Sequence, residues 1–366
     1  MAFSSGTFSL YSPGNPVVTG TTISSSWANN TLTDIASGLS TCILKDGTQT
    51  LTASIPFATF KATGVGDPTA AQDAATKNYV DRLAKNPVTG RLTLTSGTAV
   101  TTGDVTAATT LYFTPFHGVT IDVYNGTQWI PVTYAELSVT VPATASTPFD
   151  VFVSGSSTAD LTMVVTNWTN DTTRATALTT QNGILVKSGT TTQRYIGSGR
   201  TTAVSGQTED SAAKRYLFNY YNRVLRQMQI NEGTDTWTYT TATYRQANAT
   251  SRNQLDLMIG VSEDMVGATV MVVSANTSAT ASGVAALVAI GLDTTSAPSV
   301  GFLNMCSDMG VTNDKTGLMG TWAGYPGVGR HYLAWLEQSA AAGTTTWYGD
   351  NAGAIRLSGM TGVCWA

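Results

Sequence analysis

The chain has 366 residues and a net charge of −4, with 11% charged and 42% apolar side chains. This balance excludes a long disordered protein, because enough apolar surface is available to build a core. The acidic balance gives no electrostatic footprint for nucleic acid, and no run of about eighteen apolar residues predicts a membrane span. We therefore expect no nucleic-acid partner and no membrane insertion.

Residues 1–85 are predicted to form a segment with little core of its own, ordered by docking on a partner. Within residues 24–39, apolar side chains recur at near-helical spacing and predict an amphipathic helix. They are Trp27, Leu32, Ile35 and Leu39. The opening residues lack the basic region and apolar stretch of a signal peptide, so we expect synthesis in a cytoplasm without secretion.

A second, shorter helix is predicted after the glycine-containing loop 64–68. Asp73 suits the N-cap, because its carboxylate can accept hydrogen bonds from free backbone N–H groups of the first turn. Tyr79 and Leu83 lie four residues apart on one face, and Pro87 limits the helix. Because so short a helix is unstable alone in water, we expect other copies of the chain to pack against it.

The loop and the second helix contain a distinctive sequence pattern. It consists of Val65-Gly-Asp-Pro68, then Asp73-Ala-Ala-Thr-Lys77, then Tyr79-Val-Asp81. This pattern resembles a stretch of bacteriophage tail-fibre and related appendage proteins, and with the turn-rich residues before it the resemblance covers residues 8–82. The resemblance implies a homotrimeric fibre whose N-terminal part lies near the virion. The candidate residues of its trimeric helix are Asp73, Tyr79, Val80 and Leu83.

Residues 86–170 are predicted to form a small antiparallel β domain. Val119–Tyr124 alternates apolar and polar side chains, and Asn125-Gly126 is a strong hairpin signal before a return strand at Gln128–Val132. Further strands are expected at 137–141, 149–153 and 161–165. Residues 171–210 are expected to be a linker with β segments at 183–187 and 193–197.

Residues 211–366 are predicted to form a jelly-roll-like β-sandwich. A short helix is expected to begin at Thr208–Ser211, because acidic residues favour a first turn, and to run into a strand from Asn222. Strands are then expected at 237–244, 256–261, 268–273, 284–292, 330–336, 344–348 and 354–357, about the number in a jelly roll. The stretches 215–224, 237–248 and 332–350 resemble the terminal domain of phage tail and head-fibre proteins, which implies a trimer-forming jelly roll.

The sequence offers few side chains for catalysis. Its histidines, His117 and His331, have no serine elbow beside them. Neighbouring acids are expected to lie in solvated turns; they are Glu209 with Asp210, Glu232 with Asp235, and Glu263 with Asp264. The cysteines, Cys42, Cys306 and Cys364, have no disulfide or zinc spacing and are expected to be buried reduced thiols. We therefore expect no enzyme activity, no catalytic residue, no cofactor and no metal.

Clustered aromatic side chains remain as binding candidates. Exposed aromatic side chains can stack on sugars or fill protein interfaces. The alternative interpretation is that these side chains pack in the core of the domain. The candidate surface-binding residues are Trp322, Tyr325, Trp347 and Tyr348.

These expectations together describe a mainly β, homotrimeric virion appendage: a tail fibre or a fibre at the head–tail junction. Residues 1–85 would attach it to head–tail connector or tail proteins. The C-terminal domain would adsorb to a host cell-surface glycan or protein. Two alternatives stay open: a capsid decoration or cement protein, and a glycan depolymerase or esterase.

Overall fold

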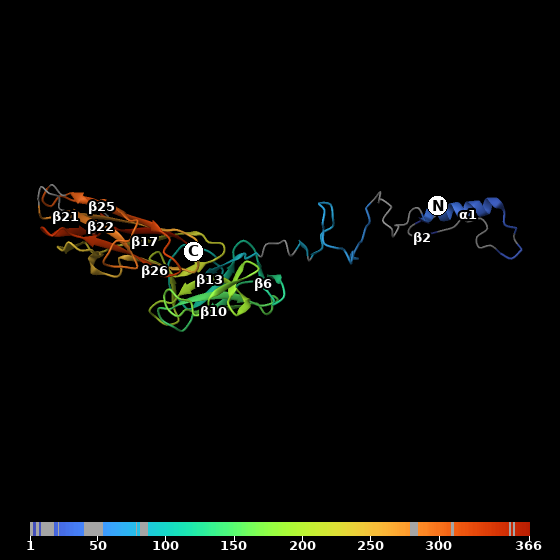
Figure 1. The fold of residues 1–366 in the computed structure, drawn as a ribbon, viewed down its shortest axis with the longest axis horizontal. Coiled ribbons are helices and arrows are strands. Elements are labelled where there is room, and N and C mark those ends of the chain that lie inside the picture. The colour runs from blue at the N-terminus through green and yellow to red at the C-terminus, as the bar shows by residue number, and fades with distance from the viewer. Residues whose placement is uncertain are drawn as a thin grey trace. The chain divides into compact units, whose positions relative to one another are not determined.

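A computed structural model describes residues 3–4, 7–8, 18–20, 22–39, 54–77, 79–80, 87–278, 285–308, 311–350, 353 and 356–366. The chain divides into two compact units, Met1–Ala74 and Ala75–Ala366 (Figure 1). The described part is mainly β, and nearly all of its strand pairs are antiparallel, which confirms the predicted β-rich class. Within these ranges, no helix combines the length and the apolar character needed to cross a membrane.

The described residues of the first unit form a short hairpin and one helix. The hairpin pairs β1 (Phe3–Ser4) with β2 (Thr7–Phe8), and the helix is α1 (Ser25–Leu39). Ser24 is the N-cap of α1, because its Oγ accepts a hydrogen bond from Trp27 N at 3.2 Å. The predicted helix over residues 24–39 is therefore confirmed.

A helical turn is also present at Lys77, Tyr79 and Val80, but Asp73 does not cap it. Thr76 Oγ1 accepts a hydrogen bond from Tyr79 N at 3.0 Å. The Asp73 carboxylate instead accepts hydrogen bonds from the backbone N–H groups of Thr69 and Ala70, each at 2.8 Å. The prediction for Asp73 was wrong because a local side-chain-to-backbone turn competes with capping. Leu83 lies outside the described residues.

The first half of the second unit is a β-sandwich, drawn mainly in green in Figure 1. One layer is a sheet in the order β10-β9-β13-β12-β11, with β16 paired to β13. The other layer is the sheet β3-β5-β8 and the hairpin β6-β7. The strands are β3 (Gly90–Thr93), β5 (Thr110–Pro115), β6 (Thr120–Tyr124), β7 (Trp129–Thr133), β8 (Leu137–Thr140), β9 (Pro148–Ser154), β10 (Thr162–Asn167), β11 (Leu178–Gln181), β12 (Ile184–Lys187), β13 (Thr190–Arg200) and β16 (Leu217–Asn219).

Local signals explain this sandwich well. The predicted hairpin is confirmed as β6 paired with β7, and Asn125 Oδ1 accepts hydrogen bonds from the N–H groups of Thr127 and Gln128. Both layers contribute to one core, in which Phe113, Ile121 and Val151 are almost fully buried. The segment 171–210, expected as a linker with β segments, contributes β11, β12 and the central strand β13.

The second half is a larger two-layer sandwich, drawn in yellow to red in Figure 1. Its sheets follow the orders β24-β22-β26-β20-β15-β14-β4 and β17-β28-β21-β25-β23, with β19 on β26 and with β27 joining β21 to β18. The strands are β4 (Val105–Ala108), β14 (Thr208–Asp210), β15 (Lys214–Arg215), β17 (Leu225–Asn231), β18 (Thr236–Tyr239), β19 (Arg245–Gln246), β20 (Gln254–Ile259), β21 (Val266–Asn276), β22 (Ala285–Leu292), β23 (Leu303–Asn304), β24 (Ser307–Asp308), β25 (Thr316–Gly324), β26 (Gly329–Gln338), β27 (Thr345–Tyr348) and β28 (Gly359–Trp365); a short 3₁₀ turn, η1, spans Ala247–Ala249. Leu257, Val270, Val288, Trp335 and Met360 lie in the core between the sheets.

Two sequence predictions fail in this half. The helix expected from Thr208 is absent, because residues 208–219 form β14, β15 and β16. Strands β25 and β28 were not predicted. The strand expected at residues 354–357 is not observed at residues 356–357, and residues 354–355 lie outside the described ranges. The reasons are long-range pairings, which local propensity does not reveal.

Candidate functional site

Buried ionic side chains lie where the two sandwiches meet. Arg215 Nη1 donates to Asp210 Oδ1 at 3.0 Å, and Arg226 Nη2 donates to Asp210 Oδ2 at 3.2 Å. Arg226 also donates to the carbonyl oxygen of Thr101 at 2.8 Å. All three charged side chains are at most 10% exposed, and a single carboxylate forms ion pairs with two buried guanidinium groups. We call this cluster, together with Arg91, the ionic junction.

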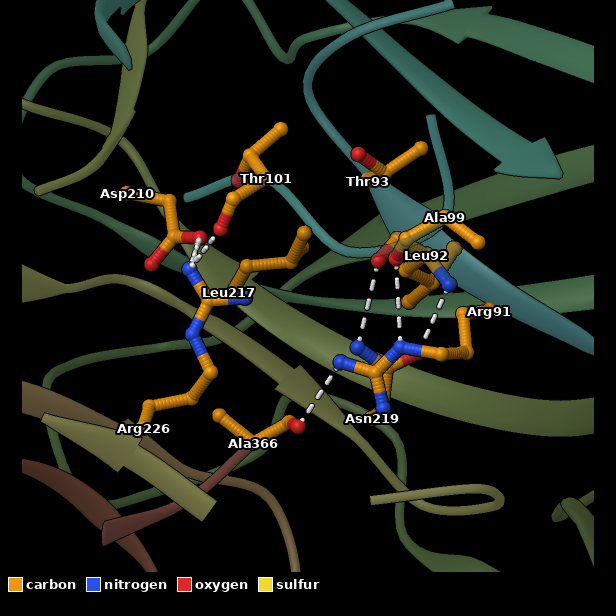
Figure 2. A pocket seen from close by; sticks show the side chains of 10 residues that line it. All are labelled: Arg91, Leu92, Thr93, Ala99, Thr101, Asp210, Leu217, Asn219, Arg226 and Ala366. Carbon is orange, nitrogen blue, oxygen red and sulfur yellow. Dashed lines mark hydrogen bonds and ion pairs between the residues drawn. The ribbon is translucent and has the colours of Figure 1, made fainter. Parts of the chain in front are cut away.

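Figure 2 shows how Arg91 completes the ionic junction from β3. Its guanidinium donates to the carbonyl oxygens of Ala366, at 2.8 Å, Ala99, at 3.2 Å, and Asn222. Burial, together with the nearby charge of Arg226, lowers the pKa of Arg91 to about 10, so it stays protonated at neutral pH. The cavity among these residues measures about 10 Å³, room for about one water molecule. The ionic junction is therefore a structural joint rather than a ligand pocket.

An open cleft lies beside the ionic junction, where β17 of one sheet faces β15 and β20 of the other. Its volume is about 600 Å³, and its walls include Lys214, Gln229, Asn231, Gln254 and Asp256. A second hollow of about 310 Å³ is also lined by Gln229 and includes Arg215 and Arg226 among its walls. We call the larger hollow the polar cleft.

Three amide side chains, Gln229, Asn231 and Gln254, line the polar cleft together with charged residues. Along β17, Gln227 Nε2 donates to Gln229 Oε1 at 3.3 Å, and Gln229 Nε2 donates to Asn231 Oδ1 at 3.2 Å. On the facing wall, Gln254 Nε2 donates to Asp256 Oδ2 at 2.8 Å. Each amide offers both donor and acceptor atoms, which suits a ligand with neighbouring hydroxyl groups.

Two acidic and two basic side chains line the polar cleft, so their charges balance: Glu209, Lys214 and Asp256 form ion pairs, whereas Arg252 lies exposed on the wall. Lys214 Nζ lies 3.0 Å from Glu209 Oε2, and Arg330 forms an ion pair with Asp256. The site therefore presents little net charge to a ligand. This balance favours a neutral, hydroxyl-rich molecule over a polyanion.

The aromatic candidates are divided between core and surface. Trp347 is fully buried and Trp322 is 5% exposed; the Nε1 of Trp322 donates to the carbonyl oxygen of Val300 at 3.1 Å. The prediction that these two tryptophans bind a surface was wrong, because both fill the space between the two sheets. Tyr325 is 66% exposed, and Tyr348 is partly exposed beside Lys315 and Arg356.

The other sequence candidates occupy structural positions. His331 Nδ1 lies 2.7 Å from Asp293 Oδ2, and the ring of His117 lies 3.9 Å from that of Phe116, measured between centroids. Within the described residues, no group of three or more His, Cys, Asp and Glu side chains is placed to hold a metal ion.

The predicted acidic pairs are engaged in hydrogen bonds and ion pairs rather than lying in solvated turns alone. Glu263 and Asp264 both pair with Arg223. Glu232 accepts a hydrogen bond from Asn253 Nδ2 at 2.6 Å and is buried.

The cysteines do not share one environment. Cys364 is buried, as predicted, whereas Cys306 is exposed, so the prediction for Cys306 was wrong. Residue Cys42 lies outside the described residues.

The polar cleft itself was not predicted. The alternation of Gln227, Gln229 and Asn231 along one strand was an available signal, but the facing wall comes from residues brought close only by folding. Comparison with known proteins gives no further guide to the site, since neither a protein-family model nor a curated protein sequence matches this chain.

Proposed function

We propose that this chain is a structural subunit of a bacteriophage virion, a trimeric tail fibre or head–tail-junction fibre. Residues 1–85 attach it to connector or tail proteins, and the second unit presents a jelly-roll-like β body for adsorption to the host surface. The observation that carries the proposal is the exposure of the first unit. Across residues 18–20, 22–39 and 54–74, Gly38 is the only buried residue.

The first unit exposes large apolar side chains as well as backbone. Leu32 and Leu39 on α1 are each 63% exposed, and Phe60 is 82% exposed. Burying such side chains contributes about 1.5–3 kcal/mol each, so a protein partner that covers them gains substantial binding energy. This property supports a role in attachment for the first unit.

The resemblance of residues 64–81 to phage appendage proteins supports the same assignment. In that family the pattern lies near the virion-bound end of the fibre. Here it spans the boundary between the exposed first unit and the second unit, and it precedes the first strand of the β body in sequence. This order agrees with an N-terminal attachment segment, a connecting helical stretch and an outward-facing β domain.

The polar cleft supports adsorption to a glycan. Its amides along β17 and on the facing wall match the hydroxyl groups of a neutral sugar chain, and the acidic and basic side chains of its walls balance in charge. A host cell-surface glycan is therefore the ligand class with matching chemistry.

Electron microscopy of virions carrying a gold-labelled copy of this protein tests the proposal. We expect label on tail or head–tail-junction fibres, with the tag at residue 1 nearer the particle than a tag at residue 366. Label spread over the capsid shell would instead identify a decoration protein, and unlabelled particles would overturn the assignment.

A second test addresses adsorption. Purified protein is applied to a panel of host-surface glycans, with Gln254→Ala as the test variant and Val119→Ala, at an exposed site outside the polar cleft, as the control. We expect Gln254→Ala to weaken glycan retention about tenfold, because it removes a hydrogen-bonding partner worth about 1–1.5 kcal/mol. Equal retention of both variants contradicts binding in the polar cleft.

A further inference from the structure

The outer side of β17 carries a continuous row of amide side chains. Gln227, Gln229 and Asn231 point to the same side of the strand, and all three are exposed. Gln227 donates to Gln229 and Gln229 donates to Asn231, so the three amides are linked in series. Alternate residues of a strand lie about 7 Å apart, so the row extends over about 13 Å from Gln227 to Asn231. We call it the amide row.

The amide row passes through both hollows beside the ionic junction. Asn231 lines the polar cleft, Gln227 lines the second hollow, and Gln229 lines both. The hollows meet where Gln229 N donates to the carbonyl oxygen of Ala212 at 2.9 Å. Ala212 lines the second hollow, and Ala213 lines the polar cleft. Because these two side chains are single methyl groups, no bulky side chain of this segment separates the hollows.

The second hollow adds hydroxyl and apolar groups to the amides. Thr101 and Thr102 lie on its wall, and Leu225, which is 56% exposed, continues the line of the amide row along β17. A sugar ring carries hydroxyl groups at its edge and C–H groups on its faces. Amide, hydroxyl and apolar side chains together therefore match the groups of a sugar.

The ionic junction fixes the buried side of the second hollow and balances its charge. Arg215 and Arg226 line this hollow, and both guanidinium groups pair with Asp210. Arg226 also donates to the carbonyl oxygen of Thr101, as Figure 2 shows. Asp104, an acid on the same wall, accepts a backbone hydrogen bond at 2.7 Å. Two acids thus match the two arginines, and groups that are already held in place lose little freedom when a ligand binds.

We propose that the polar cleft and the second hollow are two parts of one groove, in which a glycan chain of at least two sugar units lies along β17. A single sugar ring is shorter than the amide row and contacts only part of it. A chain that follows the row meets donors and acceptors in both hollows, because an amide that bonds to its neighbour keeps further hydrogen-bonding atoms. The inference rests on the glycan adsorption of the proposed function and extends it to the length and path of the ligand.

Isothermal titration calorimetry of the full chain with neutral oligosaccharides tests the inference. The probes are glucan, mannan and galactan fragments, each prepared in a series of increasing length from the single sugar. We expect affinity to rise about tenfold or more with length and then to level off, because a single sugar occupies only the larger polar cleft. Gln227→Ala should weaken binding of the longest fragment about tenfold and that of the single sugar less than about twofold, since it removes a hydrogen-bonding partner in the second hollow. Gln254→Ala, in the polar cleft, should weaken binding of both.

Two further variants and a folding check make the outcome decisive. Ala212→Trp places a bulky side chain in the second hollow and should reduce the affinity of the longest fragment to that of a short one. Gln181→Ala, on β11 and outside both hollows, should bind every fragment like the wild type. Near-ultraviolet circular dichroism should show native packing in each variant.

The outcomes separate the groove from adsorption itself. Affinity that does not depend on length, or a length dependence that Gln227→Ala and Ala212→Trp leave unchanged, overturns the inference and leaves adsorption in the polar cleft standing. A wild type that binds no fragment of any series overturns both the inference and adsorption to a neutral glycan.

Discussion

Arg174 contacts both carboxylate oxygens of Asp150, with its Nε 2.7 Å from Oδ2 and its Nη2 3.1 Å from Oδ1. The same Nη2 donates to the carbonyl oxygen of Gly260 at 2.7 Å, directly after β20. Arg174 therefore connects β9 of the first sandwich to the end of β20 in the second. Ser198 Oγ, on the neighbouring strand β13 of the same sheet, donates to Asp150 Oδ1 at 2.7 Å and helps to hold the carboxylate that Arg174 contacts.

Removing Arg174 should destabilise the second unit strongly. Arg174→Met leaves the 3% exposed carboxylate of Asp150 without its counter-ion, and breaking a buried pair in this way costs about 3–5 kcal/mol. Arg223→Met is the control, because its partners Glu263 and Asp264 are 44% and 31% exposed and such pairs contribute about 0–1 kcal/mol. Urea unfolding measures both. Equal losses in the two variants would contradict the structural role of the Asp150 pair.

Gly260 should not tolerate even a methyl group. A Cβ there would lie 2.1 Å from the Tyr195 hydroxyl oxygen, 2.6 Å from Ser198 Oγ and 2.7 Å from Phe218 Cδ1. We expect Gly260→Ala to cost about 1–3 kcal/mol through overpacking. Gly103→Ala, where a Cβ would have no neighbour within 4 Å, should change the free energy of unfolding by less than about 0.5 kcal/mol. Thermal unfolding of the two variants provides the comparison.

The buried tryptophans should matter for stability, whereas exposed Tyr325 should not. Trp347→Ala removes a fully buried indole from the core and should cost about 3–5 kcal/mol. Tyr325→Ala, at a 66% exposed position, should stay within about 0.5 kcal/mol of the wild type. Chemical denaturation followed by circular dichroism measures both changes. Little loss in Trp347→Ala would place this side chain at the surface after all.

The two described cysteines should differ in thiol reactivity. Burial raises the pKa of the Cys364 thiol to about 12, so almost no thiolate forms at pH 8. Cys306 is exposed and free. We expect iodoacetamide to label Cys306 in the folded protein within minutes and Cys364 only after unfolding, as read by peptide mass spectrometry. Comparable labelling of both thiols before unfolding would be inconsistent with the packing of β28.

Glu337 should make stability depend on pH. Burial raises its pKa above 4.5, although Trp237 Nε1, at 2.6 Å, and Arg245 oppose the shift. The folded state binds the Glu337 proton more tightly than the unfolded state does. The resulting contribution to the free energy of unfolding is complete below about pH 4.5, and it is lost as pH rises through the folded-state pKa. Glu337→Gln removes the titration, so the stability of the wild type relative to this variant should fall over that interval. Denaturant unfolding at several pH values tests this; a constant difference would contradict the raised pKa.

Local signals predicted the strands whose partners are near in sequence. The hairpin of residues 120–133 follows from alternation around Asn125-Gly126. The helix expected from Thr208 failed because Asp210 pairs with Arg215 across a tight turn and with the more distant Arg226. These contacts stabilise a strand in a stretch whose local composition favours a helix, so tertiary structure overrides propensity.

Glycine misled the prediction of β25. Gly317, Gly320 and Gly324 gave this stretch the pattern of a loop, yet a Cβ at Gly320 would lie 3.1 Å from Val270 Cγ1 and 3.2 Å from the Val288 carbonyl oxygen. Glycine there permits close packing of the sheets rather than a turn. The polar cleft was unpredictable for a related reason, since its walls come from separate segments, 209–214, 229–231 and 251–256.

The contact between Arg91 and Ala366 has a mechanical consequence. It places β3, the first strand of the β body, beside Ala366, the residue that directly follows β28. A tensile force applied between these two points is carried first by the hydrogen bond from Arg91 Nη2 to the Ala366 carbonyl oxygen, before either sandwich is stretched. The body would therefore resist the start of extension through a side-chain bond at one corner, and its sheets would be loaded only after that bond breaks.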